Sequence, residues 1–185
     1  MIQGSEEWRL ARCGKVGASR IADLMARTRN GYGASRANYM AEIIIERLTG
    51  QPTNGYCNAA MLWGVETEPQ ARAAYEFRYD AEVVEVGMVQ HPSIEDAGAS
   101  PDGLVGDDGL VEIKCPQSAT HIDILLSGAV PDKYIKQMQF QMACTGRSWC
   151  DFVSFDPRLP EHLQLFRQRV TRDDETIAEI ASEVR

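Results

Sequence analysis

The residues best suited to chemistry lie in two short segments in the middle of the chain. A Ser-Pro-Asp-Gly stretch contains Asp102, and a Leu-Val-Glu-Ile-Lys stretch contains Glu112 and Lys114. Residues 106–109, Gly-Asp-Asp-Gly, predict a turn that joins two strands into a hairpin. Because side chains alternate along a strand, Glu112 and Lys114 project from the same face, and the hairpin can bring Asp102 beside them.

Two carboxylates that converge repel each other unless a divalent cation lies between them. Oxygen ligands without Cys or His favour Mg²⁺ or Mn²⁺ over Zn²⁺. A lysine beside such a metal can orient or deprotonate a water, and the metal charge favours its neutral form. Any soluble hairpin also carries exposed acids and lysines, so the spacing alone leaves both interpretations open. The apolar residues Val111 and Ile113 around the charged pair favour a site.

The hairpin is expected within a mixed sheet that follows a helical N-terminal part. Hydrophobic periodicity and capping residues predict helices at 5–12, 19–26, 35–49, 58–79, 120–126, 132–143 and 174–185, and strands at 83–89, 99–105, 110–115, 149–155 and 163–170. Residues 28–33 form a glycine-rich basic loop, and Pro69 must start or kink a helical turn. This order predicts an α/β (α+β) fold with a central mixed sheet flanked by helices.

Composition limits the protein to one globular domain. Its 185 residues, 44% hydrophobic and 25% charged, are enough for one sizeable core and too few for two comfortable ones. No apolar run approaches the ~20 residues of a membrane span, and the N-terminus lacks the basic and apolar regions of a signal peptide. We therefore expect a cytoplasmic protein without a membrane partner.

Cysteine and histidine usage argues against zinc and iron–sulfur sites. The five cysteines are odd in number and show no CxxC spacing, and the three histidines lie far apart without an HExxH pattern. The cysteines are therefore expected as reduced thiols. They are Cys13, Cys57, Cys115, Cys144 and Cys150.

The net charge of −8 is unusual for a nucleic-acid binder, but it is unevenly distributed. Residues 1–36 contain seven basic and three acidic side chains, which leaves −12 on the rest of the chain. This asymmetry fits an enzyme that contacts DNA along one face and holds metals with carboxylates elsewhere. It also fits a protein that never binds DNA, so charge alone does not decide.

The segments taken together resemble a known family. The Pro-Asp followed by Glu-x-Lys resembles the PD-(D/E)xK nuclease motif, and longer strings resemble the lambda-type 5′→3′ exonucleases of the YqaJ viral recombinase family. The matching strings run in family order over nearly the whole chain. They are Trp63-Gly64-x-x-x-Glu68-Pro69-x-Ala71-Arg72, Ser100-Pro101-Asp102-Gly103, Leu110-x-Glu112-x-Lys114-Cys115-Pro116, Tyr134-x-x-Gln137-x-Gln139 and Asp156-Pro157-Arg158.

The resemblance implies a role for each matching position. Glu68, Asp102, Glu112 and the backbone carbonyl of Ile113 are implied as metal ligands, with Lys114 as the residue that activates water. These positions, except that of the carbonyl, are also implied to be catalytic.

Further positions are implied to contact the substrate. Gln137 is implied to contact the nucleophile or a phosphate, and Gln139 is the weaker candidate of the two glutamines; Tyr134 and Gln139 are implied to bind substrate. Gln137 and Gln139 lie two apart on one helix and cannot share a face.

The resemblance also implies a pocket for a terminal 5′-phosphate at Arg12, Ser19 and Ser100. An arginine supplies a forked cationic donor and serines supply neutral donors, which suits a phosphate. Alternatively, Ser19 caps a helix, and Arg12 complements the dipole at a helix C-terminus.

The implied activity is Mg²⁺-dependent 5′→3′ degradation of one strand of linear duplex DNA, leaving 3′ overhangs for phage-type recombination. It implies a restriction-endonuclease-like PD-(D/E)xK core, two Mg²⁺ ions for which Mn²⁺ can substitute, and 5′-phosphorylated DNA ends as substrate. A homotrimeric ring and a single-strand annealing protein as partner are also implied, in a phage or prophage protein of a bacterial host.

The implied domain layout is one nuclease domain over 1–185. Residues 1–80 would be mainly helical and include the DNA-contacting loop, 81–172 would form the catalytic sheet core, and 173–185 the C-terminal helix. Two other functions remain open, which are a structure-specific endonuclease or resolvase on the same core and a catalytically silent DNA-end-binding scaffold.

Overall fold

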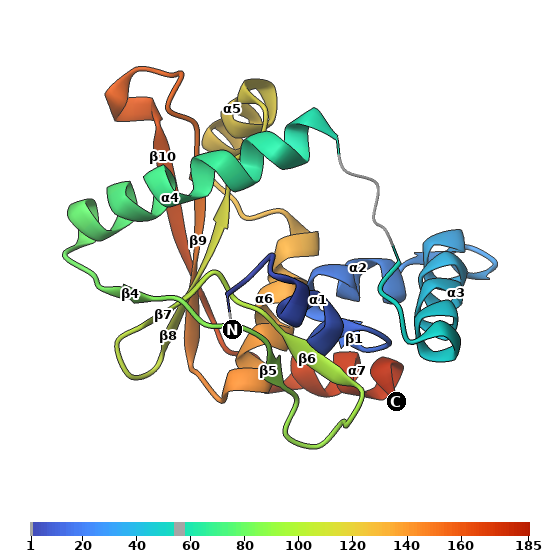
Figure 1. Ribbon diagram of the computed structural model, residues 1–185. Helices are drawn as coiled ribbons and strands as arrows, with labels where there is room; N and C mark the ends of the chain where they lie inside the picture. Colours follow the sequence, from blue (N-terminus) through green and yellow to red (C-terminus); the bar gives the residue numbers. More distant parts are fainter. Residues whose placement is uncertain (1, 54–57) are drawn as a thin grey trace.

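The computed structural model describes residues 2–53 and 58–185. A five-stranded sheet lies at its centre, in the order β10-β9-β8-β7-β4 (Figure 1). Its strands are β4 (Val83–Val84), β7 (Gly103–Val105), β8 (Gly109–Lys114), β9 (Trp149–Phe155) and β10 (Leu165–Thr171). Within the described part of this sheet, β8 and β9 pair in parallel and the other neighbours are antiparallel. The crossover from β8 to β9 consists of α5 (Ser118–Ser127) and α6 (Asp132–Thr145), as a parallel connection requires.

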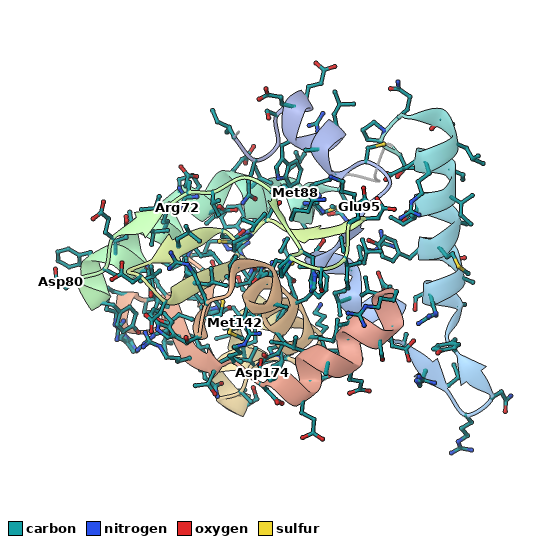
Figure 2. All side chains as sticks on the ribbon, turned by 90° about the horizontal axis from the view of Figure 1, so that it is seen from below. Arg72, Asp80, Met88, Glu95, Met142 and Asp174 are labelled. Atoms are coloured by element: carbon teal, nitrogen blue, oxygen red, sulfur yellow. The ribbon has the colours of Figure 1, made fainter. Side chains whose placement is uncertain are left out.

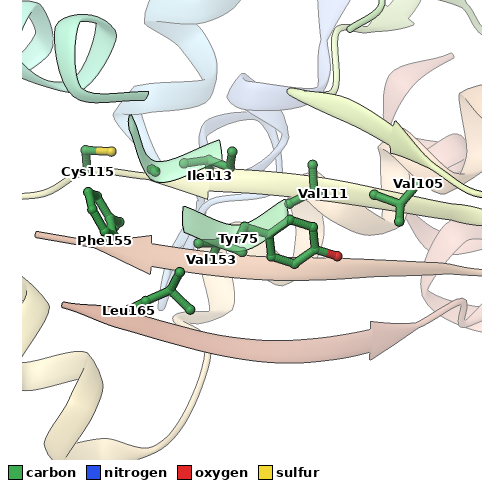
Figure 3. Close-up of a cluster of buried hydrophobic side chains, with 9 residues drawn as sticks. Tyr75, Val105, Val111, Ile113, Cys115, Val153, Phe155 and Leu165 are labelled. Carbon is green, nitrogen blue, oxygen red and sulfur yellow. The ribbon is translucent and has the colours of Figure 1, made fainter. Parts of the chain in front are cut away.

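Helices cover both faces of this sheet. On one face α4 (Ala59–Tyr79) crosses the strands, and its Tyr75 packs with Val111 and Val153 (Figure 3). On the other face α5 and α6 contribute Ile124 and Met138 to a second buried cluster. Because β8 has helices on both sides, every residue from Gly109 to Ile113 is buried. A charged side chain on β8 is therefore enclosed by protein.

A smaller three-stranded sheet lies beside α6. It has the order β1-β6-β5 and consists of β1 (Val16–Gly17), β5 (Val89–Gln90) and β6 (Ala97–Ala99). The N-terminal helices α1 (Glu6–Arg12), η1 (Ala18–Arg20) and α2 (Ile21–Leu24) and the C-terminal α7 (Asp174–Val184) complete this part of the fold. Its apolar core joins Ile21, Phe140 and Ile180, which come from α2, α6 and α7.

Two of the expected strands are each divided between the sheets. The strand expected at 83–89 is β4 in the large sheet and β5 in the small one, and that expected at 99–105 is β6 and β7. The second break falls at Pro101, which has no N–H to offer a ladder. Beyond it, Gly103 allows close strand contact, since a Cβ there would lie 2.1 Å from Val83 Cγ1. The prediction of continuous strands was wrong, and the break leaves Asp102 outside regular pairing.

The remaining elements follow the expected order with small shifts. Residues 28–33, expected as a loop, belong to a short hairpin of β2 (Arg27–Thr28) and β3 (Gly31–Tyr32). α3 (Ala34–Thr49) follows, and α4 continues through Pro69. η2 (Glu161–Leu163) precedes β10, which begins two residues later than expected. Cys57 lies outside the described residues, and the other four cysteines are free thiols.

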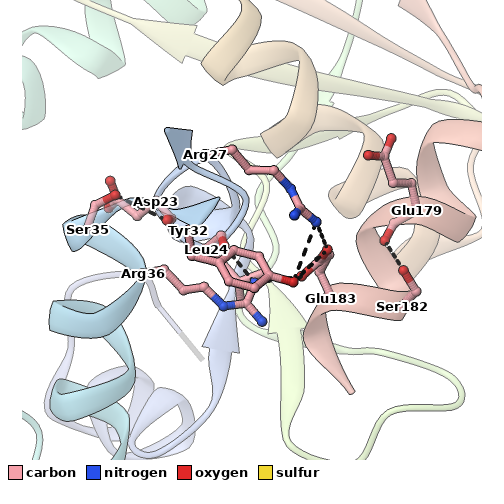
Figure 4. A network of polar contacts seen from close by, with 9 residues as sticks. All are labelled: Asp23, Leu24, Arg27, Tyr32, Ser35, Arg36, Glu179, Ser182 and Glu183. Atoms are coloured by element: carbon pink, nitrogen blue, oxygen red, sulfur yellow. Dashed lines mark hydrogen bonds and ion pairs between the residues drawn. The ribbon is translucent and has the colours of Figure 1, made fainter. Parts of the chain in front are cut away.

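The C-terminal helix holds the basic hairpin in place (Figure 4). Glu183 of α7 accepts hydrogen bonds from Arg27 at 2.5 Å, Tyr32 at 3.0 Å and Arg36 at 2.7 Å. Burial alone would raise the pKa of Glu183, but these hydrogen bonds and the two arginine charges outweigh it and lower the pKa. The hairpin and α3 stand out from the body of the molecule (Figure 2), and Glu183 connects both of them to α7.

One buried acid links the sheet to α4 and to the edge strand. Asp151 of β9 is fully buried, accepts a hydrogen bond from Tyr75 at 2.8 Å, and pairs with Arg167 and Arg169 of β10 at 3.0 and 2.8 Å. Burial would raise the pKa of Asp151, but the hydrogen bonds from Arg169, Tyr75 and Arg167 lower it.

Replacing Asp151 is expected to destabilise the fold. Asp151→Asn removes the charge that two partly exposed arginines share, and we expect a loss on the order of 2–3 kcal/mol in the free energy of unfolding measured with urea. Asp174→Asn is the matched control, because its pair with Arg172 is 80% exposed on the acid side, and should change stability by less than about 1 kcal/mol. Equal losses in the two variants would contradict this account of Asp151.

Candidate active site

The candidate site forms where β7 ends and β8 continues. Gly103, the first residue of β7, pairs with Val111, so Asp102 lies opposite Glu112. Asp102 Oδ2 accepts a hydrogen bond of 2.7 Å from the N–H of Ile113. Both backbone groups of a strand residue point to the same side, so the Ile113 carbonyl also faces the edge that Asp102 occupies. The hairpin thus brings the Asp102 carboxylate beside Glu112, and the Ile113 carbonyl faces the same space.

Glu112 is a carboxylate enclosed between β8 and α6. Its side chain is 1% exposed, and both of its oxygens have partners. Oε1 accepts hydrogen bonds from Lys114 and, at 2.6 Å, from Gln137, whereas Oε2 accepts one of 2.6 Å from Gln141. The two glutamines lie four apart on α6, so they project from one face of that helix toward the acid.

The charges around Asp102 indicate that the site is short of positive charge. Burial raises the pKa of Asp102 well above its ordinary value, and the charges of Glu112 and Glu68 raise it further. Burial would lower the pKa of Lys114, but the charges of Glu112 and Asp102 outweigh it, so Lys114 stays protonated. One lysine thus faces two carboxylates, and an all-oxygen set with excess negative charge suits a hard divalent cation.

Glu68 lies at the border of this cluster. It is close enough to raise the pKa of Asp102, but its Oε1 pairs with Arg72 one turn further along α4 at 2.9 Å. Arg72 also pairs with Glu85 at 2.6 Å. Over 2–53 and 58–185, no three acidic, histidine or cysteine side chains gather closely enough to hold a metal by themselves. Arg72 holds one oxygen of Glu68, and no hydrogen bond or ion pair to Oε2 is found among the described residues.

Tyr134 adjoins the cluster and Gln139 does not. The Lys114 ammonium lies 5.3 Å from the centre of the Tyr134 ring, and that ring stacks on Phe152. Gln139 points to the other side of α6, where its amide donates to the Thr171 carbonyl and accepts from the N–H of Asp173. It therefore connects α6 to the segment before α7.

The residues expected around a terminal phosphate line one small cavity. It has a volume of about 30 Å³ and is bordered by Arg12, Ser19, Ser100, Lys15 and also Gln137. Burial lowers the pKa of Arg12, which the nearby Tyr39 and Glu46 raise only partly. Among the described residues, the Arg12 guanidinium has no ion-pair partner. A cation enclosed in this way favours an anionic ligand.

Three residues of the site were not predicted from the sequence. Gln141 holds Glu112, and Lys15 adds a second cation to the cavity. Trp8 donates from Nε1 to Ser100 Oγ at 2.9 Å, and the Arg12 guanidinium lies 4.2 Å from its ring centre. The four-residue spacing of Gln137 and Gln141, and of Trp8 and Arg12, is the signal that could have revealed Gln141 and Trp8, whereas Lys15 has no such signal.

Two of the family-like strings, those of Trp63 and of Asp156–Arg158, connect α4 to the end of β9. Asp156 is fully buried after β9 and pairs with Arg158, whose guanidinium lies 4.3 Å from the Trp63 ring centre on α4. Burial would raise the pKa of Asp156, but hydrogen bonds from Arg158 and Ser118 lower it to about 2. This contact fixes α4, and with it Glu68, against the end of β9.

Over the described residues, no helix is long and apolar enough to cross a membrane. Residues 7–148 match the model of the YqaJ-like viral recombinase domain family. A comparison with curated proteins found no match.

Solved structures show the same relationship. An alkaline exonuclease (LHK-Exo) from Laribacter hongkongensis is 57% identical, with a TM-score of 0.91 over 97% of this chain and 89% of that chain. Its complex with dAMP gives a TM-score of 0.92 at the same identity and coverage. A phage-related exonuclease from Haemophilus somnus 129PT shares the fold at 16% identity, with a TM-score of 0.70 over 92% of this chain and 90% of that one.

These matches confirm the predicted mixed α/β fold with a PD-(D/E)xK core. They also confirm the family that the motif strings indicate. The chain therefore belongs to the YqaJ-like viral recombinase domain family, and it is a deoxyribonuclease of the exonuclease type.

Proposed function

We propose that this exonuclease degrades one strand of linear duplex DNA in the 5′→3′ direction with Mg²⁺ and leaves 3′ overhangs. The observation that carries the proposal is the position of Gln137. Its amide donates to Glu112, and the same residue borders the cavity of Arg12, Ser19 and Ser100. An anion-binding cavity that shares a wall with the acidic cluster suits an enzyme that holds a strand by its terminal phosphate.

Asp102, Glu112, the Ile113 carbonyl and Glu68 are the proposed metal ligands. Two bound Mg²⁺ ions would supply an activated water and stabilise the leaving 3′-oxygen, and Mn²⁺ can substitute. The charges of Glu112 and Asp102 raise the pKa of Lys114, so its ammonium can donate a hydrogen bond to a water or a phosphate oxygen. Positive charge nearby would lower its pKa and let it accept a proton. Gln137 and Tyr134 would orient the substrate beside Lys114.

The ligand of one relative resembles the expected product of the proposed reaction. The Laribacter enzyme binds dAMP, which is a single deoxynucleotide with one phosphate. Removal of nucleotides one at a time yields molecules of this kind. A structure-specific endonuclease on the same core would instead cut within a strand, and cleavage of covalently closed duplex DNA would support it.

Family membership also motivates a proposal about assembly. We expect a homotrimeric ring around DNA and transfer of the exposed strand to a single-strand annealing protein. Exposed apolar side chains on two helices offer contact area for a partner. They are Met40, Ile44 and Leu48 on α3, and Met61, Leu62 and Val65 on α4.

Removing either central carboxylate should abolish metal-dependent cleavage. Asp102→Ala and Glu112→Ala are expected to release no nucleotides from linear duplex DNA in Mg²⁺ while they remain folded by circular dichroism. Mg²⁺ should raise the melting temperature of the wild type but not that of either variant, because the ligands are gone. The control is Asp107→Ala, which removes an exposed acid from the turn of the same hairpin. Near-wild-type activity in either carboxylate variant would show that the site is misassigned.

Lys114→Ala should separate catalysis from metal binding. Turnover is expected to fall by about 10²- to 10⁴-fold, as for loss of a group that activates a nucleophile. Calorimetric titration with Mg²⁺ should still show binding, since both carboxylates remain. Loss of Mg²⁺ binding together with activity would assign Lys114 a structural role instead.

The cavity should make the enzyme prefer 5′-phosphorylated ends. A charge-assisted contact from Arg12 contributes about 1.5–3 kcal/mol, which corresponds to roughly a tenfold to hundredfold preference over 5′-hydroxyl ends. Arg12→Ala should remove most of this preference by slowing only the phosphorylated substrate. Ser19→Ala and Ser100→Ala should act in the same direction and more weakly, because each removes a neutral donor.

The control for this experiment is Arg9→Ala, which removes an exposed arginine from the same helix. It should keep the preference for the phosphorylated end. If Arg12→Ala instead lowers the melting temperature and slows both substrates equally, Arg12 only closes its helix. Labelling linear duplex DNA at the 5′ or the 3′ end, with and without Mg²⁺, measures the direction of degradation in the same assay.

A further inference from the structure

We propose that Gln141 is a positioning residue that makes Glu112 offer a single oxygen to a metal and thereby favours Mg²⁺ over Ca²⁺. The inference rests on the proposed function, because it assumes that Glu112 is a metal ligand. Gln141 itself is fully buried and lies on α6 behind the acid. It contacts no substrate in this account and acts through Glu112.

The two oxygens of Glu112 are held in different ways. Among the described residues, Oε2 accepts a hydrogen bond from Gln141 alone, at 2.6 Å, and the side chains of Glu112 and Gln141 are both enclosed in the core. Oε1 is shared by Gln137 and Lys114, and the lysine side chain is 27% exposed on a long flexible stem. A cation can therefore displace Lys114 from Oε1, whereas reaching Oε2 requires breaking a buried hydrogen bond.

The orientation of the Gln141 amide follows from the chemistry of its partner. An ionised carboxylate only accepts hydrogen bonds, so the amide must present its nitrogen to Glu112. Its oxygen, Oε1, is then buried and has no hydrogen-bond partner among the described residues. An unmet buried acceptor destabilises the fold, and a Leu or Met at this position would not have that cost. The hydrogen bond that the Gln141 nitrogen donates to Glu112 explains why a glutamine occupies this position.

Holding Oε2 affects two cations differently. Mg²⁺ requires nearly octahedral geometry and is usually bound through few carboxylate contacts, whereas Ca²⁺ readily accepts both oxygens of one carboxylate. When Gln141 retains Oε2, Glu112 can bind Mg²⁺ through Oε1 but cannot offer both oxygens to Ca²⁺. The Gln141 hydrogen bond also fixes the orientation of Glu112 before any metal arrives, which saves ordering on binding.

Calorimetric titration of the whole protein without DNA tests this assignment. Mg²⁺ and Ca²⁺ are titrated separately into the wild type, Gln141→Met and Gln141→Leu. Both substitutions remove the hydrogen-bond donor of Gln141 and replace it with an apolar side chain of similar size. In the variants the Kd for Mg²⁺ should rise by about 10- to 100-fold, as is typical when a partner of a metal ligand is lost. The Kd for Ca²⁺ should change little or fall, because Glu112 can then use both oxygens.

Gln139→Leu is the matched control. It removes a buried glutamine from the same helix whose amide bonds to the backbone at residues 171 and 173 and not to the acid. The melting temperature of this variant should fall, but its ratio of Ca²⁺ to Mg²⁺ affinity should equal that of the wild type. A structural role for Gln141 would give the same pattern as this control.

The outcomes separate the inference from the function on which it rests. If the wild type binds no Mg²⁺, or Asp102→Ala binds it as well as the wild type does, the proposed function fails. If the wild type binds Mg²⁺ through Asp102 but both Gln141 variants keep the wild-type affinity ratio, only the assignment of Gln141 is overturned. A ratio shifted toward Ca²⁺ in the Gln141 variants and not in Gln139→Leu supports it.

Discussion

The structure depends on a carboxylate that is buried on the central strand of the sheet. Glu112 lies on β8, which has helices on both faces, and is 1% exposed. An ionised acid in such a place is costly unless donors surround it. Lys114 and the amides of Gln137 and Gln141 supply those donors. α6 must therefore present Gln137 and Gln141 to the sheet beside Glu112, where apolar side chains would otherwise pack.

This constraint accounts for the arrangement at the end of β7. Were β7 to continue, a strand would pair with the backbone of Ile113 and cover the acid. Instead Pro101 ends regular pairing, and the Asp102 side chain accepts the hydrogen bond from the Ile113 N–H. The strand edge is thus capped by a carboxylate, and its neighbouring carbonyl faces the same space. Both features place oxygen atoms beside Glu112.

The same helix connects the acidic cluster to the cationic cavity. Gln137 contacts Glu112 on one side and borders the cavity of Arg12 and Lys15 on the other. Gln137 thereby adjoins both the acidic cluster and the cationic cavity. A chain of net charge −8 thus still carries a local group of cations, which favours an anionic ligand at this cavity.

Much of this protein can be predicted from local sequence, because helices and strands have distinct hydrophobic periods. The α4, α6, α7 and β9 elements follow from periodicity and capping, and the motif strings identify the family. Alternation along β8 places Glu112 and Lys114 on one face, and the turn at 106–109 brings Asp102 opposite. These are short-range relations that the order of residues determines by itself.

Contacts between distant segments were decided only by the tertiary structure. The divisions between β4 and β5 and between β6 and β7 arise because one chain serves two sheets, which no local pattern encodes. The partners of Glu112 on α6 and the turning of Gln139 toward Thr171 depend on how helices rotate against the sheet. Trp8 meets Ser100 across 92 positions of sequence. Residue types determined which chemistry was available, and packing decided which of those groups meet.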